Sequence, residues 1–142
     1  MKILVTGAGG LIGGYLARTL SRQGHQVVAT YRNSEPTQSS NNIEIKWVKL
    51  DLADGLQQLE PVDVIIHAAA HTHLVLDSTA SDYIQSNLVG TVNLAKYAQA
   101  TGTRLVVYIS TLSVYGAIEV AELREDTPLN GPQMYGATKY MS

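Results

Sequence analysis

Cysteine is absent from this sequence of 142 residues. The chain therefore forms no disulfide and has no thiolate chemistry, a composition that suits the cytosol. Long apolar runs are missing too, because no stretch approaches the roughly 20 residues that a membrane span needs. The apolar run near the N-terminus is also too short for the core of a signal peptide. The sequence predicts a soluble chain located in the cytoplasm, with no membrane partner.

An excess of charge of one sign is also lacking. Ten Lys and Arg residues face 12 Asp and Glu residues, which gives a net charge of -2. No basic run stands out, and Trp47 and the eight tyrosines show no stacking pattern, so nucleic acid is not an expected partner. What the chain does have is apolar content. Hydrophobic residues make up 45% of it, enough for one domain with a real core over residues 1–142.

Short apolar runs alternate with segments of helical periodicity. Strands are expected at residues 2–6, 26–31, 43–50, within 62–70, and at 104–110. Helices are expected over 11–23 and 80–101, with a third beginning near Tyr135. Strands separated by helices form parallel βαβ units, and near-continuous Val, Ile and Leu runs are typical of parallel strands buried on both faces. The sequence therefore predicts an α/β fold, a doubly wound Rossmann-type parallel sheet with strand order 3-2-1-4-5.

The apolar residues of both long helices recur at helical spacing and define one face of each. That face holds Ile12, Leu16 and Leu20 in the first helix, and Ile84, Leu88, Val92 and Ala95 in the second. Residues 53–60 are expected to form a short helix or turn. Residues 33–42 and 116–134 have loop composition.

A glycine-rich turn, "TGAGGLIG", follows the first strand and opens the first helix. Gly7 permits the tight turn, Gly10 lets the backbone approach a pyrophosphate, and Gly13 allows close packing of helix and strand. The N-terminus of the helix offers N–H groups and partial positive charge to the phosphates. The alternative, a plain glycine turn, is disfavoured by this position between strand and helix.

The end of the second strand, "ATYRNS", bears on the choice of nicotinamide cofactor. An acidic residue there would bind the ribose 2′-hydroxyl of NAD, but the position holds Tyr31 and Arg32 follows it. Arg32 could hold a 2′-phosphate by charge-assisted hydrogen bonds, with Asn33 and Ser34 as further donors. The sequence therefore favours NADP over NAD. The alternative is that Arg32 is a solvated loop arginine.

Tyr135 and Lys139 are four residues apart, so both lie on one face of a helix. A tyrosine side chain is ordinarily a poor base at pH 7, but a nearby ammonium and an oxidised nicotinamide both favour its phenolate form. Lysine can also hydrogen-bond the nicotinamide ribose. Tyr135 would then take a proton from a substrate hydroxyl, or give one in the reduction.

The motifs "TGAGGLIG", "HAAA", "NLVGTVNL", "STLSVYG" and "YGATK" occur in the order and spacing of the extended short-chain dehydrogenase/reductases. The chain resembles this family of sugar-nucleotide epimerases, dehydratases and reductases over its whole length. The resemblance implies an NAD(P)-dependent oxidoreductase or epimerase that transfers hydride at a hydroxyl or keto carbon, with a nucleotide-linked sugar as substrate. The chain itself would lack the C-terminal substrate region, bind cofactor poorly and be inactive alone.

The resemblance also assigns site residues. Thr111, Tyr135 and Lys139 would be catalytic, with the hydroxyl of Thr111 polarising the reacting oxygen, and Ser113 would contact the substrate. Asp51 and Leu52 would border the adenine, and Asn87 would support the site, although an isolated asparagine is more often a solvated or capping residue. The cofactor-binding residues would be Gly7, Gly10, Leu11, Ile12, Gly13, Tyr31, Arg32, Asn33, Asp51, Leu52, Ala68, Ala69, Ala70, Asn87, Tyr135 and Lys139.

The two residues that follow Thr111 narrow the class of reaction. Dehydratases of the family carry an Asp-Glu pair there, and the related decarboxylases a Glu at the second position, whereas this chain has Leu112 and Ser113. Neither side chain is an acid or base at neutral pH, which leaves an epimerase or a reductase. The alternatives are a reductase of a non-sugar ketone or aldehyde, and a non-catalytic dinucleotide-sensing module, which the joint presence of Thr111, Tyr135 and Lys139 disfavours.

Two further expectations concern partners and metals. The resemblance implies a homodimer of the intact protein, formed through the helix in 80–101 and the one that starts at Tyr135. No metal is expected, because His67 lies on a buried strand and His71 and His73 follow it in a loop without a regularly spaced carboxylate. Such histidines are more often core or loop residues than ligands.

Overall fold

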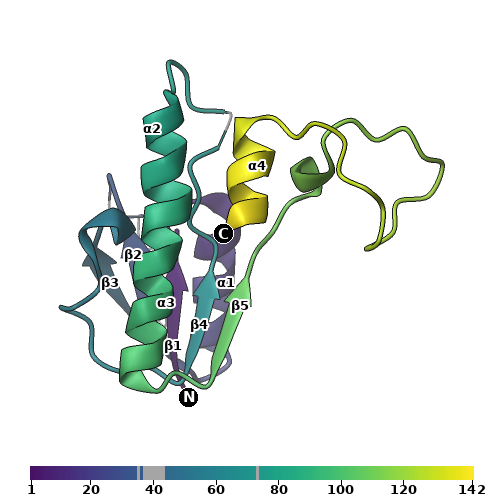
Figure 1. Cartoon of the computed structure of the whole chain (residues 1–142). Helices are drawn as coiled ribbons and strands as arrows, with labels where there is room; N and C mark the ends of the chain where they lie inside the picture. The colour runs from purple at the N-terminus through teal and green to yellow at the C-terminus, as the bar shows by residue number, and fades with distance from the viewer. Residues whose placement is uncertain (35, 37–43, 73) are drawn as a thin grey trace.

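Five parallel strands form one sheet at the centre of the molecule (Figure 1). The computed structural model describes residues 1–34, 36, 44–72 and 74–142. The strands are β1 (Lys2–Thr6), β2 (Gln26–Tyr31), β3 (Ile45–Lys49), β4 (Val64–His67) and β5 (Leu105–Tyr108). Their order, β3-β2-β1-β4-β5, confirms the predicted topology. Ile43, expected to begin the third strand, and most of the predicted loop 33–42 lie outside the described residues.

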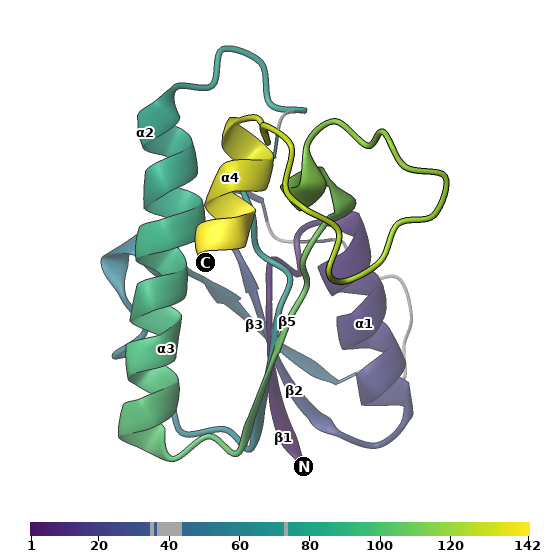
Figure 2. The same cartoon turned by 45° about the vertical axis from the view of Figure 1, so that its right-hand side comes forward.

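Helices cover both faces of the sheet, as Figure 2 shows, so the predicted doubly wound fold is confirmed. Helix α1 (Leu11–Arg22) lies on one face. The other face carries one continuous helix made of α2 (Ala80–Tyr83), a π-helical segment η2 (Ile84–Val89) and α3 (Gly90–Thr101). The remaining helices are η1 (Leu52–Asp54), η3 (Leu112–Tyr115) and α4 (Met134–Met141). Within the described ranges, every helix is too short or too polar to cross a bilayer.

Alternation along the strands divides the core into two layers. Leu4, Val28 and Ile65 face the long helix and pack with Leu94 and Tyr97 of α3. Their neighbours on the same strands point to the other face, where they pack with α1; these are Ile3, Val5, Val27 and Ala29. Because both layers are apolar, the strand sequences are hydrophobic without interruption.

The apolar face predicted for α1 is only partly buried. The helix buries Gly13, Gly14 and Ala17, whereas Ile12 is 56% exposed. Leu20 packs only partly buried against the core on this face. The stripe of small residues lets α1 approach the sheet more closely than a stripe of leucines would allow. Ile12 consequently faces outward at the N-terminal end of the helix.

In the long helix, the predicted apolar face is the outer one. Ile84 and Val92 are 42% and 52% exposed, and Ala95 is exposed as well. The buried stripe runs one or two residues away and mixes polar with apolar side chains; it comprises Tyr83, Asn87, Gly90, Leu94, Tyr97 and Ala98. Hydrophobic spacing identified the helix correctly but could not identify a buried stripe that contains an asparagine.

Strand β5 is the edge of the sheet next to the site. In the described part of the chain it pairs with β4 alone. Leu105, Val106 and Val107 are 53%, 44% and 39% exposed, so this edge of the sheet presents apolar side chains to solvent. After β5 the chain makes an irregular excursion over 116–133. A bridge between Gly116 and Asn130 closes the excursion, and α4 then packs against η3.

Candidate functional site

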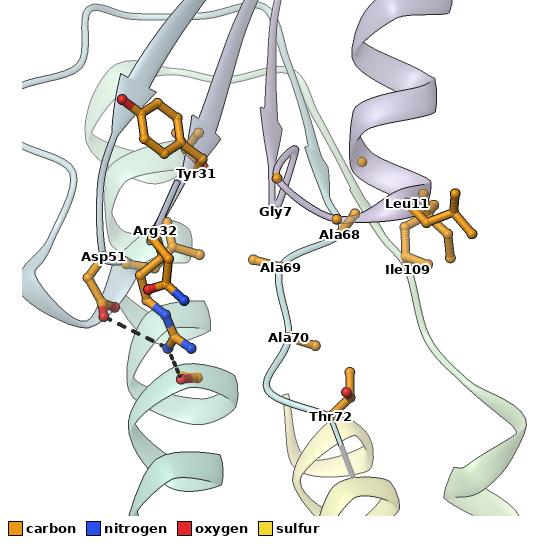
Figure 3. Close-up of a pocket in the computed structure, with 18 of the residues that line it drawn as sticks. Gly7, Leu11, Tyr31, Arg32, Asp51, Ala68, Ala69, Ala70, Thr72 and Ile109 are labelled. Carbon is orange, nitrogen blue, oxygen red and sulfur yellow. Dashed lines mark hydrogen bonds and ion pairs between the residues drawn. The ribbon is translucent and has the colours of Figure 1, made fainter. Parts of the chain in front are cut away.

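A cleft of about 810 Å³ opens at the carboxyl ends of the strands (Figure 3). Its walls come from the glycine-rich turn after β1, from the segments that follow β2, β3, β4 and β5, and from α4. The strand order reverses between β1 and β4, because β1 continues to β2 on one side while β4 lies on the other. Ligands of open α/β sheets bind in such a crevice, and the volume is in the range of ligand pockets.

The cleft brings together nearly all of the predicted site residues. They are Gly7, Gly10, Leu11, Ile12, Gly13, Tyr31, Arg32, Asn33, Asp51, Leu52, Ala68, Ala69, Ala70, Thr111, Tyr135 and Lys139. The two predicted residues that do not line it are Asn87 and Ser113. Lining residues that the sequence analysis did not assign to the site include Thr72, Leu74, Ser86 and Ile109.

The glycine-rich turn is shaped for close approach of an anion. Gly7 has a φ of +68°, which favours glycine. A Cβ on Gly13 would lie 2.5 Å from the Gly7 carbonyl oxygen, so only glycine permits this contact between helix and turn. Gly10 caps α1 without any side-chain hydrogen bond. Among the described residues, no side chain caps the first N–H groups of the helix, and such groups are suited to an anion.

Arg32 spans the end of the cleft beyond β2. Its Nη1 donates to Ser86 Oγ at 2.9 Å and lies 4.0 Å from Asp51 Oδ2 (Figure 3). Asp51 is fixed in turn, since its Oδ1 accepts the N–H of Ala53 at 3.0 Å. The Arg32 side chain is 46% exposed, yet it is held between two elements rather than free in a loop. Ser86 comes from η2, and no sequence motif indicates that it lies beside Arg32.

His67, the last residue of β4, is buried in a chain of hydrogen bonds that fixes which of its ring nitrogens carries the proton. Its Nε2 lies 2.9 Å from Thr91 Oγ1, and that hydroxyl donates to the Asn87 carbonyl at 2.6 Å. Nε2 must therefore carry the proton. Nδ1 then accepts from Thr6 Oγ1 at 2.7 Å. Burial, and secondarily the charge of Lys139, lowers the pKa of His67 to about 4, so the imidazole is neutral at pH 7.

Asn87 is 2% exposed and joins the segment after β4 to α4. Its Oδ1 accepts the N–H of His71 at 2.7 Å, and its Nδ2 donates to the His71 carbonyl at 3.1 Å and to Thr138 Oγ1 at 3.0 Å. Thr138 immediately precedes Lys139. Asn87 therefore does not reach the cleft. Its hydrogen bonds fix the position of α4 relative to the sheet, and with it the positions of Tyr135 and Lys139.

Thr111 and Ser113 hold one another at the end of β5. The N–H of Ser113 donates to Thr111 Oγ1 at 3.2 Å, and Thr111 Oγ1 donates to Ser113 Oγ at 3.2 Å. Thr111 caps η3 and lines the cleft, whereas Ser113 lies within η3 and does not. In this structure, Ser113 orients Thr111.

Lys139 is 3% exposed as a residue, yet it contributes to the wall of the cleft. Burial lowers its pKa to about 8. Its Nζ lies 3.8 Å from the centre of the Tyr108 ring.

The histidines that follow β4 in the sequence are His71, which is buried, and His73, which lies outside the described residues. Among the described residues, no three His, Asp or Glu side chains gather in a group that could hold a metal.

The sequence relatives include proteins named UDP-glucose 4-epimerase and putative dihydroflavonol 4-reductase. A UDP-glucose 4-epimerase of Mycolicibacterium smegmatis is 36% identical over 98% of this chain and 48% of its own length. A putative dihydroflavonol 4-reductase of Synechocystis is 38% identical over 79% of this chain and 33% of its own length. The chain thus spans half, or less, of the length of these relatives.

Solved structures agree with the sequence relatives. The crystal structure of a UDP-galactose 4-epimerase superposes with a TM-score of 0.85 at 30% identity, covering 99% of this chain and 48% of that one. MoeE5 in complex with UDP-glucose and NAD superposes with a TM-score of 0.80 at 29% identity, covering 99% and 46%. The family described as NAD dependent epimerase/dehydratase matches residues 3–142. The chain, with its glycine-rich turn and its cleft at the strand ends, therefore belongs to the NAD dependent epimerase/dehydratase family.

Proposed function

We propose that the intact protein is an NAD(P)-dependent epimerase or reductase that transfers hydride at a hydroxyl or keto carbon of a nucleotide-linked sugar. One observation carries the proposal: Thr111, Tyr135 and Lys139 line the same cleft as the glycine-rich turn. The substrate class is supported by the relatives named UDP-glucose 4-epimerase and by the neighbour solved with UDP-glucose and NAD. A non-sugar ketone is the second candidate, favoured by relatives named dihydroflavonol 4-reductase and 2-alkyl-3-oxoalkanoate reductase.

The residues suit proton transfer at a carbinol oxygen. When bound, the nicotinamide dinucleotide supplies the acceptor or donor of hydride. Tyr135 would take the proton of the substrate hydroxyl as that carbon is oxidised, and return it as the carbonyl is reduced. Thr111 would turn its hydroxyl proton from Ser113 Oγ to the same substrate oxygen, while the N–H of Ser113 continues to donate to Thr111 Oγ1. The Lys139 ammonium would favour the phenolate of Tyr135 by its charge.

For the cofactor we propose a preference for NADP. Arg32 presents a guanidinium at the end of the cleft, and the hydroxyl of Ser86 lies 2.9 Å from it. Together they would give a 2′-phosphate one cation and one hydroxyl donor. Several structural neighbours were solved in complex with NAD, which makes NAD the competing choice.

Adenosine fragments test this preference without any need for turnover. We expect 2′,5′-ADP to bind the protein more tightly than 5′-ADP, and Arg32→Ala to remove the difference. Arg18→Ala, which changes an arginine of α1 that does not line the cleft, is the matched control. Equal affinity for the two nucleotides in the unaltered protein would reject NADP in favour of NAD.

Two further points concern the oligomeric state and the cellular location of the protein. We propose a homodimer that packs the outer face of the long helix against a second copy. The exposed apolar side chains of Ile84 and Val92 support it. A cytoplasmic location stays a prediction from composition. Analytical ultracentrifugation of the full-length protein tests the dimer, since Val92→Asp on that face is expected to yield monomers.

Substitution of Tyr135 by Phe in the full-length protein tests the reaction. We expect kcat to fall by two or more orders of magnitude, because general acid–base catalysis contributes about 10²–10⁴-fold. Tyr140→Phe, on the same helix and 64% exposed, serves as the control and is expected to leave kcat unchanged. Unaltered turnover in Tyr135→Phe would refute the role of Tyr135 in the reaction. A complete absence of turnover with nucleotide sugars and ketones in the unaltered protein would support the non-catalytic sensing module instead.

A further inference from the structure

Lys139 carries a buried cationic side chain. Within the described residues, its Nζ forms no ion pair and no hydrogen bond. A buried ammonium that lacks such a partner is costly. The group that faces it is the ring of Tyr108, whose centre is 3.8 Å from Nζ. An aromatic face at this distance attracts a cation through the ring quadrupole.

The Tyr108 ring is itself held in place from two sides. Tyr108 ends β5 and lies opposite His67 of β4 in the register of the sheet, with the two rings 5.4 Å apart and inclined at 49°. Its hydroxyl donates to the Lys139 carbonyl at 3.2 Å. Burial raises the pKa of this phenol, so the hydroxyl keeps its proton as a donor. Tyr108 therefore contacts Lys139 at both ends, the backbone through the hydroxyl and the ammonium through the ring face.

Titratable groups reach this pair from three elements. Tyr108 lies on β5, His67 on β4, and Tyr135 on α4 itself, where it interacts electrostatically with Tyr108. His67 is neutral by its hydrogen-bond pattern, so it does not repel the ammonium. Burial raises the pKa of Tyr108 and lowers that of His67, so neither group is charged at neutral pH. The face of the Tyr108 ring is therefore the group that offsets the charge of the Lys139 ammonium.

We propose that Tyr108 is a positioning residue whose ring seats the Lys139 ammonium at the wall of the cleft. The inference rests on the proposed function, in which that ammonium acts on Tyr135. Removing the ring face leaves the buried ammonium uncompensated, so the neutral amine becomes favoured. Removing only the hydroxyl leaves the seat intact.

The test is an NMR titration of lysines labelled with ¹³C at Cε, in the chain without cofactor or substrate. In Tyr108→Leu we expect the pKa of Lys139 to fall by about 0.5 to 1.5 pH units relative to the unaltered chain. In Tyr108→Phe, which keeps the ring, we expect a change under about 0.3 pH units, since the ring face carries the effect. Tyr140→Leu, which removes an exposed ring next to Lys139, is the matched control and is expected to change nothing.

Two outcomes overturn the proposal: an unchanged Lys139 titration in Tyr108→Leu, or a fall in Tyr108→Phe as large as that in Tyr108→Leu. If Tyr108→Leu does not fold, phenylalanine with one, two or three ring fluorines at position 108 replaces it. The pKa of Lys139 should then fall stepwise as the number of fluorines rises. A pKa that does not change along the series would refute the proposed contact between the ring and the ammonium. Because no turnover is measured, this result is separate from that of Tyr135→Phe, which tests the reaction itself.

Discussion

Replacing Asn87 by alanine probes the link that fixes α4 against the sheet. The substitution removes three hydrogen bonds, two with the His71 backbone and one with Thr138 Oγ1. Each is worth about 1 kcal/mol net, and a buried N–H left without an acceptor costs about 1–3 kcal/mol more. The sum is a loss of about 4–6 kcal/mol in the free energy of unfolding, a large part of the roughly 5–15 kcal/mol typical of a domain.

Urea denaturation followed by circular dichroism measures this loss. Asn93→Ala is the matched comparison, because Asn93 lies on the same helix and its Nδ2 donates to two carbonyls, of Leu52 and Ala53, both at 3.0 Å. Asn93 is only half-buried, so water can replace these bonds and the expected loss is about 1–2 kcal/mol. If Asn87→Ala is no more destabilising than Asn93→Ala, then Asn87 does not fix α4 against the sheet.

Two further predictions concern His67 at the end of β4 and the glycine-rich turn. Between pH 6.5 and 4, unfolded chains take up a proton on His67 that the folded chain refuses, so stability should fall by about 2 kcal/mol from pH 7 to pH 5. Denaturation midpoints at the two pH values check this, and His67→Gln should flatten the dependence; an equally steep slope in that variant would contradict it. Gly13→Ala should lower Tm well below that of Gly10→Ala, because the new Cβ would meet the Gly7 oxygen at 2.5 Å rather than 3.4 Å. Calorimetry that gave equal Tm values would show that the turn can relax.

The sequence was sufficient for the fold because its strands are short, apolar and separated by helices. The order of the five strands follows from that alternation, and the structure confirms it. The buried faces of the helices could not be predicted from hydrophobic spacing. In α1 the buried stripe is made of Gly13, Gly14 and Ala17, which hydrophobic spacing does not weigh. A contact that depends on the absence of side chains leaves a weak periodic signal.

The site was predictable where one motif supplies one wall. The glycine-rich turn and the four-residue spacing of Tyr135 and Lys139 are local patterns, whereas Thr111 was assigned through the resemblance to the extended short-chain dehydrogenase/reductases. All of these residues line the cleft. Contacts across the chain were not predictable, because they join residues far apart in sequence. Ser86 meets Arg32 across 54 residues, and Tyr108 meets the Lys139 carbonyl across 31. Such pairs are set by how the helices dock, which a single sequence does not encode in its spacing.

The outer edge of β5 carries a practical consequence for anyone who prepares this chain. A strand edge offers backbone donors and acceptors to any extended segment that comes alongside, and here the neighbouring side chains, Leu105, Val106 and Val107, are apolar and solvent-facing. Such an edge recruits copies of itself as concentration rises. Dilute samples and a charged substitution such as Val106→Lys should keep the material monodisperse.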